Sequence, residues 1–208
     1  MRFVRFGVTL ERLQHKHLEL VRQWRNSDLV RPNMRFRELI FPAEEVRWFE
    51  GLGPKTNWYF AAATGEVPFA LFHVRDIDWA KGLGEAGGFV GDKMSLGRPE
   101  AARATLALMD FAFFVLQLRS LQVHYSPRVR KIALFNQQLG YQIDQLEADG
   151  FVCSSVTADR YLQCAAPFRK AALRRYGVTA AVHDPDPLLA PRLEELRRLE
   201  LADFQVQL

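Results

Sequence analysis

The sequence predicts an α+β fold in which helices flank a central mixed, mostly antiparallel sheet. Two apolar, β-rich runs at 58–63 and 67–74 are joined by Thr-Gly-Glu at 64–66, which is a strong hairpin signal. A strand, helix, strand and helix then follow in succession between residues 85 and 141. Antiparallel strands that lead into such a succession are typical of a sandwich of helices on a mixed sheet.

The composition indicates a packed globule. The chain has 208 residues, enough for one domain or one domain with an appendage, and 49% of them are hydrophobic, which disfavours disorder. A net charge of +4 is compatible with a small anionic ligand and too small to indicate nucleic acid. Cys153 and Cys164 are expected to be free thiols, with a disulfide between them as the alternative. They have no metal-ligand spacing, and no metal site is predicted. Residues 1–7 lack the apolar core of a signal peptide, and a cytoplasmic location is expected.

The N-terminal part begins with a predicted strand at 3–10, followed by an amphipathic helix that ends near Asn26. Residues 31–37 form a basic connector, which is either a solvated loop or a pocket wall whose arginines pair with a diphosphate. A helix is expected at 41–52, because glutamates in its first turn suit the helix dipole. Residues 76–84 are expected to form a turn.

A strand at 85–91 precedes a long helix predicted at 98–120. Pro99 suits the first helical position, where its missing N–H would have had no partner. Apart from a narrow polar stripe that includes Arg103 and Asp110, the helix is apolar, which indicates burial against a sheet. These two charges also argue against a membrane span, so no membrane association is expected.

The later elements are shorter. Alternation predicts a strand at 118–125, helical spacing returns at 128–139, and Gly140 suits a C-cap. The remaining expected elements are strands at 142–148, 151–155 and 161–165, a basic helix at 168–176, a proline-rich linker at 182–188 and an amphipathic helix at 191–204. The domain is therefore expected to span 1–177, with the linker and last helix at 178–208. That helix is a candidate either for a homodimer contact or for packing on the sheet.

Four motifs, in order, carry a resemblance to a known family. WRN at 24–26, PAEEVRWF at 42–49, DFAF at 110–113 and LGY at 139–141 together resemble the GCN5-related N-acetyltransferase (GNAT) superfamily. The wording is most similar to the branches that act on nucleotide-linked aminosugars and on ribosomal-protein N-termini. The resemblance runs from about residue 8 to about residue 169.

The resemblance implies a GNAT-like α/β sandwich and a transfer of an acetyl group from acetyl-CoA to a primary amine. A small-molecule amine is the expected acceptor, with a nucleotide-linked aminosugar as the candidate, and a protein N-terminus is an alternative. A second alternative is a non-catalytic GNAT-like binding module that has lost tight CoA binding.

The departures from the family pattern concern the acyl-CoA loop, which reads Q/R-x-x-G-x-G/A in the family. With Gly97 as the first glycine, Met94 falls where Gln or Arg belongs and Pro99 where the second glycine belongs. Pro99 has no N–H to offer, and the following Glu100 would lie close to the phosphates. The family's Asn before the last helix falls at Arg130, and its frequent Tyr falls at Asn136.

The predicted site residues follow from this resemblance and from the order of elements. Glu85 is the candidate general base, with an edge glutamate in water as the equally weighted alternative, and Tyr125 is the candidate proton donor. His124 should face away from Tyr125, because strand side chains alternate. Gly87 and Gly88 leave side-chain space that a ligand can approach.

The remaining predicted site residues fall in two sets. The expected acetyl-CoA contacts are Phe89, Val90, Gly91, Leu96, Gly97, Arg98, Ala101, Ala102, Arg130, Lys131 and Asn136. The expected acceptor contacts are Trp24, Arg25, Asn33 and Arg35. The alternative for the cations is the ordinary one, a solvated surface position.

Overall fold

The computed structural model describes residues 1–177, 179–189, 191–192 and 205–207. In this part of the chain, ten strands form one sheet in the order β10-β9-β1-β2-β3-β4-β5-β6-β8-β7. The strands are β1 Arg2–Arg5, β2 Val8–Arg12, β3 Trp58–Thr64, β4 Val67–Asp78, β5 Leu83–Val90, β6 Ser120–Tyr125, β7 Gln142–Leu146, β8 Val152–Thr157, β9 Thr179–His183 and β10 Gln205–Gln207. Only β5 with β6 and β9 with β10 pair in parallel among them, so the predicted mixed, mostly antiparallel sheet is confirmed.

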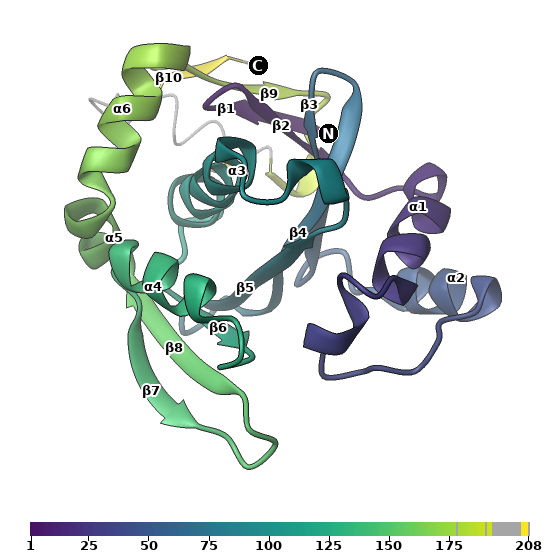
Figure 1. Ribbon diagram of the computed structural model, residues 1–208. Coiled ribbons are helices and arrows are strands. Elements are labelled where there is room, and N and C mark those ends of the chain that lie inside the picture. Colours follow the sequence, from purple (N-terminus) through teal and green to yellow (C-terminus); the bar gives the residue numbers. More distant parts are fainter. Residues whose placement is uncertain (178, 190, 193–204, 208) are drawn as a thin grey trace.

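Helices cover both faces of this sheet (Figure 1). They are α1 His15–Asn26, α2 Pro42–Glu50, α3 Pro99–Asp110, α4 Arg130–Gln138, α5 Ala158–Cys164 and α6 Ala166–Tyr176, with short 3-10 turns at Arg31–Asn33, Lys93–Ser95 and Pro187–Leu189. A large core lies between α3 and the sheet, and a smaller one lies beneath α1 and α2. No helix in the described ranges has the length and apolar character needed to cross a bilayer. Both cysteines are free thiols, as predicted.

The single strand predicted at 3–10 is wrong. This segment forms a hairpin of two strands, β1 and β2. Phe6 and Gly7 have positive φ angles of 55° and 69° and form a tight turn, so that Arg5 pairs with Val8. The apolar alternation continues through the turn, since Phe6 and Val8 are both 1% exposed. The buried positions change from odd (Phe3, Arg5) before the turn to even (Val8, Leu10) after it, but the sequence does not reveal this because residues 4, 6, 8 and 10 are all apolar.

The predicted turn at 76–84 is too long. β4 continues to Asp78 and β5 begins at Leu83, with Asp78 paired to Leu83. A shift in the strand register between Arg75 and Asp78 accommodates Asp76, whose φ is 51°. The polar residues that suggested a turn are strand residues at the edge of a bulge.

The predicted helix at 98–120 is also too long. α3 ends at Asp110, a π-helical turn Phe111–Val115 follows, and Gln117 has a φ of 55° that breaks the helix before β6. Leu116 and Leu118 on either side of the break are buried in the same core. The helix end and the strand start are therefore equally apolar, and composition does not separate them.

The predicted strand at 161–165 is a helix instead. α5 runs from Ala158 to Cys164, and the Thr157 side chain caps it by accepting a hydrogen bond from the backbone N–H of Arg160. The predicted linker at 182–188 is partly wrong, because β9 extends to His183 and pairs with β1. The helix expected at 191–204, and its dimer contact, lie outside the described residues except for 191–192. The domain boundary at residue 177 stays a prediction.

The buried carboxylate of Asp110 ties α3 to the surrounding elements. It is 0% exposed and accepts hydrogen bonds from Arg5 Nε at 3.1 Å, Arg169 Nε at 3.0 Å and Tyr161 Oη at 2.8 Å. These partners come from β1, α6 and α5. A buried charge is tolerated only when it is paired and hydrogen-bonded in this way. The polar stripe expected on the long helix is therefore an internal connection at this position.

Replacing Asp110 with Asn should destabilise the fold by about 3–5 kcal/mol, because two buried guanidinium groups lose their carboxylate. Urea unfolding followed by circular dichroism measures the change in the free energy of unfolding. Asp28→Asn, at an exposed carboxylate that pairs loosely with Arg31 at 3.7 Å, is the control and should change stability by less than about 1 kcal/mol. Equal effects of the two substitutions would contradict the structural role of Asp110.

Candidate active site

The two parallel neighbours β5 and β6 stay paired for only a short distance. Their register joins Leu83 with Ser120, Gly84 with Leu121 and Glu85 with Gln122, and no later pair exists although both strands continue. β5 runs five residues further, to Val90, while remaining paired with β4 on its other side. The two strands therefore diverge beyond Glu85, and the edge of β5 that faces β6 is left without a partner strand.

Hydrogen bonding on the other side of β5 identifies which backbone groups are left over. The N–H of Gly91 donates to the carbonyl of Phe69 at 2.9 Å. In an antiparallel pair the bonded positions alternate, so the odd-numbered residues of β5 bond to β4. The N–H and C=O groups of Ala86, Gly88 and Val90 therefore point toward β6. Of the three predicted main-chain contacts, only Val90 has its groups directed there, whereas Gly91 uses its N–H within the sheet.

The loop after β5 leads directly into the N-terminus of α3. Arg98 is the N-cap residue and makes no side-chain capping bond, and Pro99 occupies the first helical position. The N–H groups of Glu100 and Ala101 have no acceptor within the helix. The N–H of Ala102, a predicted acetyl-CoA contact, makes the first hydrogen bond within α3. Leu96 donates its N–H to Lys93 O at 3.4 Å. Gly97 has a φ of 72°, and a Cβ added to it would meet no atom within 4 Å.

Glu100, expected to repel phosphates, turns away along the helix. Its carboxylate lies 3.3 Å from Arg103 Nη2, and Arg103 also donates to the carbonyl of Phe6 at 2.8 Å. The negative charge of Glu100 is thus compensated within α3. A free helix N-terminus with a compensated carboxylate remains an electrostatically suitable anion site.

The predicted cations lie at the starts of α3 and α4, the helices that follow the two diverging strands. Arg98, Arg130 and Lys131 are exposed and form no ion pair with any described residue. Asn136 lies deeper in α4, is 7% exposed, and has an amide nitrogen without a hydrogen-bond partner in the described part of the chain. The end of the sheet where β5 and β6 separate is therefore positively charged on its rim.

Glu85 lies at the point of divergence, on the face of the sheet that α1 and α2 cover. Its carboxylate pairs with Arg75 Nη2 at 2.7 Å and lies 3.9 Å from His124 Nε2, and its side chain is 19% exposed. Tyr125 is on the opposite face, is 6% exposed, and has its hydroxyl 3.3 Å from Ser154 Oγ. The predicted opposition of His124 and Tyr125 is confirmed, and it is His124 that shares the face of Glu85.

Arg35, predicted to contact the acceptor, bridges two segments that are distant in sequence. Its guanidinium pairs with Glu147, lies 3.1 Å from Asp149 and 3.1 Å from His124 Nδ1, and stacks 4.9 Å from the Phe151 ring. The loop before α2 is thereby held to the turn between β7 and β8. Two carboxylates therefore already compensate the positive charge of this guanidinium.

The other predicted acceptor contacts differ in their surroundings. Asn33 donates to Leu29 O at 3.3 Å within the exposed loop. Trp24 is 9% exposed and belongs to the smaller core, where it lies so close to Gly91 that any side chain there would overlap its ring. Trp24 therefore supports the end of β5.

The glycine pair in β5 was interpreted as space for a ligand, and the structure corrects this. A Cβ on Gly87 would lie 2.6 Å from His73 Nε2, so the imidazole of His73 fills that space. A Cβ on Gly88 would overlap the carbonyl of Leu71 in β4. The two glycines accommodate β4, and His73 was not identified from the sequence because cross-strand neighbours depend on the register.

His73 and its neighbours form a buried polar cluster under α1 and α2. The imidazole lies 4.9 Å from the ring of Tyr59, and burial together with the charges of Arg75 and Arg25 lowers the pKa of His73 to about 3. Burial raises the pKa of Glu45 in α2, although Arg25 opposes this. Arg25, a predicted acceptor contact, has its own pKa lowered by burial. This cluster lies on the same face as Glu85.

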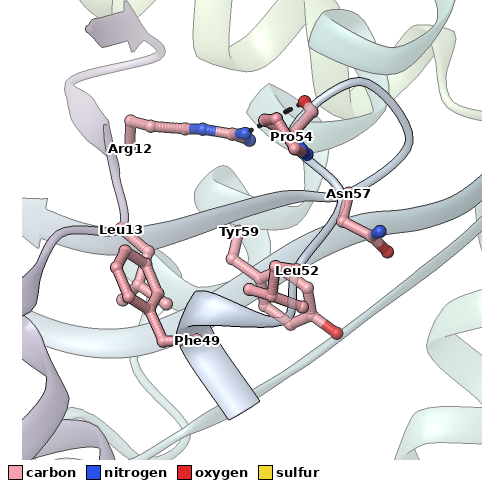
Figure 2. Close-up of a pocket in the computed structure, with 7 residues that line it drawn as sticks. All are labelled: Arg12, Leu13, Phe49, Leu52, Pro54, Asn57 and Tyr59. Atoms are coloured by element: carbon pink, nitrogen blue, oxygen red, sulfur yellow. Dashed lines mark hydrogen bonds between the residues drawn. The ribbon is translucent and has the colours of Figure 1, made fainter. Parts of the chain in front are cut away.

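A small hollow lies on the same face, at the end of the sheet next to α2 (Figure 2). Its volume is about 110 Å³, and it is lined by Arg12, Leu13, Phe49, Leu52, Pro54, Asn57 and Tyr59. Arg12 donates to the Pro54 carbonyl at 3.3 Å across its rim. None of the lining residues belongs to β5 or β6, so this hollow is separate from the diverging strands.

Comparison with known proteins identifies the architecture. No family model and no curated protein matches the sequence. Among solved structures, spermidine N-acetyltransferase from Vibrio cholerae in complex with CoA and spermine superposes with a TM-score of 0.65 at 14% identity, covering 75% of this chain and 98% of that one. An uncharacterized protein from Bacillus halodurans gives a TM-score of 0.67 at 12% identity and covers 79% and 91%. A domain from Methanocaldococcus jannaschii gives 0.64 at 13% identity and covers 72% and 97%.

These similarities establish the fold. The chain has the GNAT fold, an α/β sandwich with a mixed sheet, as its sequence motifs predicted. The similarity covers the greater part of both chains in each comparison.

His73 should make the protein sensitive to acid. Its pKa is lowered in the folded state from 6.5 to about 3, so the unfolded chain binds the proton first as the pH falls. Stability is therefore intact above about pH 6.5 and should decline by up to about 1.4 kcal/mol per pH unit between pH 6 and pH 4. His73→Gln should flatten this slope in urea unfolding measured at several pH values, whereas His15→Gln, at a side chain that is 70% exposed, should not. An unchanged slope in His73→Gln would contradict the buried neutral state.

Proposed function

We propose that this chain is an N-acetyltransferase that moves an acetyl group from acetyl-CoA to a primary amine of a small molecule. The observation that carries the proposal is the divergence of β5 and β6 beyond Glu85, which leaves backbone groups of β5 directed into the opening. The GNAT fold and its match to an enzyme bound to CoA support the same conclusion. We expect the protein to act in the cytoplasm, without nucleic acid as a partner.

The main chain is proposed to hold the pantetheine arm of the co-substrate. An extended amide-containing ligand can bond to an unpaired strand edge as an additional strand does. Val90 and Gly88 offer their N–H and C=O groups on that edge. The diphosphate is then expected at Glu100 and Ala101, whose N–H groups are free, with Arg98, Arg130 and Lys131 around it. Pro99 reduces the number of donors by one relative to the family pattern.

The reaction requires one bond to form and one to break. The lone pair of the amine nitrogen attacks the thioester carbonyl carbon, the C–N bond forms, the C–S bond breaks, and the departing sulfur receives a proton. Glu85 is proposed to accept the proton from the amine, because it lies where β5 and β6 separate and Arg75 fixes its carboxylate. His124 lies on the same face of the sheet, and its Nε2 atom, 3.9 Å from the Glu85 carboxylate, is a second polar contact of that carboxylate.

Protonation of the departing sulfur is assigned to residues on the opposite face of the sheet. Tyr125 remains the predicted proton donor, and its hydroxyl lies beside Ser154. Asn136 occupies the position of the family's frequent Tyr and carries a buried amide N–H group without a partner in the described chain. An amide does not supply a proton, but it can donate a hydrogen bond to the developing thiolate.

Two further acceptor classes belong to this proposal. A nucleotide-linked aminosugar is the acceptor that the sequence resemblance favours, and a protein N-terminus is its alternative. The non-catalytic binding module is favoured by one observation, the proline and glutamate at the start of α3 in place of the second glycine. The two experiments below separate it from the enzyme.

Glu85→Gln should lower kcat by about 10²–10⁴-fold, because the amide does not accept the proton of the amine. The measurement is thiol release from acetyl-CoA in the presence of a panel of amines, with KM for acetyl-CoA expected to be unchanged. Glu66→Gln, in the exposed turn before β4, is the control and should retain full activity. Full activity of Glu85→Gln would exclude it as the base.

Arg98→Glu should weaken acetyl-CoA binding by about tenfold or more, because it places a negative charge at the proposed diphosphate site. Isothermal titration calorimetry measures the change, and Arg47→Glu on the exposed side of α2 is the matched control. Increasing salt should weaken binding to the unsubstituted protein. Absence of any heat from the unsubstituted protein would reject the enzyme in favour of the binding module.

A further inference from the structure

His124 lies between two carboxylates on the face of the sheet that carries Glu85. Its Nε2 atom is 3.9 Å from the Glu85 carboxylate, and its Nδ1 atom is 3.1 Å from Oε2 of Glu147, in the turn between β7 and β8. Each ring nitrogen thus has a different carboxylate as its neighbour. The imidazole therefore connects the proposed general base with an acidic residue that is distant from it in the sequence.

The exposure of these side chains increases with distance from the diverging strands. Glu85 and His124 are 19% and 18% exposed, and Glu147 is 22% exposed. Arg35, which pairs with Glu147, is 44% exposed. The series of polar groups therefore begins where β5 and β6 separate and ends at the solvent-exposed turn.

The neighbours of His124 define which ring nitrogen carries the proton of the neutral imidazole. A carboxylate only accepts hydrogen bonds, so Nδ1 donates its N–H to Glu147. Arg35 Nη2 is also 3.1 Å from Nδ1, but a guanidinium only donates, and Glu147 and Asp149 already pair with it. Glu147 accepts from both groups in this arrangement. The free lone pair is then on Nε2, the nitrogen nearer to Glu85.

The thiol of Cys153 shows that the two carboxylates share one electrostatic environment. Cys153 is opposite His124 in the register of β6 and β8. Burial raises the pKa of this thiol, and the negative charges of Asp144, Glu147 and Glu85 raise it further. A proton that moves from Glu85 to Glu147 therefore stays close to carboxylates along its path.

The proposed reaction requires such a path. Each turnover leaves the proton of the amine on Glu85, and the carboxylate must lose this proton before the next turnover. Bound substrates exclude water from the reaction site, so direct loss to solvent is hindered. Arg75 pairs with the same carboxylate at 2.7 Å, but a guanidinium has no lone pair with which to accept a proton. An imidazole accepts a proton on one nitrogen and donates one from the other.

We propose that His124 relays the proton of the acceptor amine from Glu85 to Glu147. The O–H bond of protonated Glu85 breaks as an N–H bond forms at Nε2, and the Nδ1–H bond breaks as Glu147 takes that proton and releases it to water. Exchange with water returns the proton from Nε2 to Nδ1 before the next turnover. The separation of 3.9 Å shortens when substrate binds, as is common for catalytic hydrogen bonds. This inference rests on the proposed acetyltransferase function and adds the route by which its base is regenerated.

The experiment measures thiol release from acetyl-CoA with spermidine, glucosamine and a nucleotide-linked aminosugar as amines. His124→Gln should lower kcat roughly 10- to 100-fold, because an amide carries no proton between its two ends, and the loss should be smaller than in Glu85→Gln. KM for acetyl-CoA should not change. Asp144→Asn is the matched control on the same hairpin, since Asp144 accepts a hydrogen bond from Ser155 Oγ at 2.9 Å, and it should retain full activity.

Double variants separate a relay from independent structural roles. Residues that act in one path give losses that do not add, so Glu85→Gln combined with His124→Gln should be no slower than Glu85→Gln alone. Glu147→Gln should likewise cause no further loss when it is combined with His124→Gln. Free imidazole should restore activity to His124→Ala, because it supplies the missing proton carrier. Urea unfolding checks that each variant is folded.

The outcomes distinguish the relay from the function on which it rests. Failure of the unsubstituted protein to turn over any amine, or to bind acetyl-CoA in calorimetry, rejects the enzyme and the relay together. An active enzyme that loses kcat in Glu85→Gln but keeps it in His124→Gln retains its base and overturns the relay. Additive losses in the double variants, or a folded His124→Ala that does not respond to imidazole, also overturn it.

Discussion

The end of hydrogen bonding between β5 and β6 is the constraint on which the site depends. After Glu85 and Gln122 the two strands no longer share a ladder, and β5 remains supported only by β4. An unpaired strand edge inside a sheet is unfavourable unless another backbone-like group bonds to it. Both helices that follow these strands begin at the same end of the opening, which brings free N–H groups and cations to one rim. The fold therefore brings the proposed anion site and the proposed strand-edge site to the same end of the sheet.

A second set of contacts keeps that opening in place from the other face of the sheet. The carboxylate of Asp110 joins α3 to β1, α5 and α6, and the α3 layer packs on the sheet through the large core. On the α1 side, Trp24 braces the end of β5. The arrangement at Glu85 is thus fixed from both faces. Buried polar atoms of Glu45, His73 and Asn136 have no hydrogen-bond partner in the described part of the chain.

The sequence predicted the core of the fold well where pattern and capping agree. The hairpin between β3 and β4 and the start of α3 at Pro99 follow from local chemistry, and the predicted C-cap of α4 is displaced by one residue, since Leu139 is the C-cap and Gly140, with a φ of 96°, follows it. The prediction from sequence failed where the local residues carry no signal for a turn, a helix end or a strand pairing. The turn at Phe6 is hidden because the residues at 4, 6, 8 and 10 are all apolar. The break after Val115 lies within a uniformly buried segment, and β9 joins the sheet through pairing with a strand more than 170 residues earlier in the chain. Distant pairing has no signature in a single segment.

The sequence by itself determined the GNAT-like order of elements, the altered glycine loop and the candidate base Glu85, because each depends on residue type and on neighbours along the chain. Only the tertiary structure decided that the strands separate after Glu85, that Arg35 is bound by Glu147 and Asp149, and that His73 fills the space over Gly87. The physical reason is that hydrogen-bond satisfaction is a property of the assembled sheet. Which donors and acceptors remain open for a ligand is settled by strand register and cross-chain pairing, and neither is encoded within one stretch of residues.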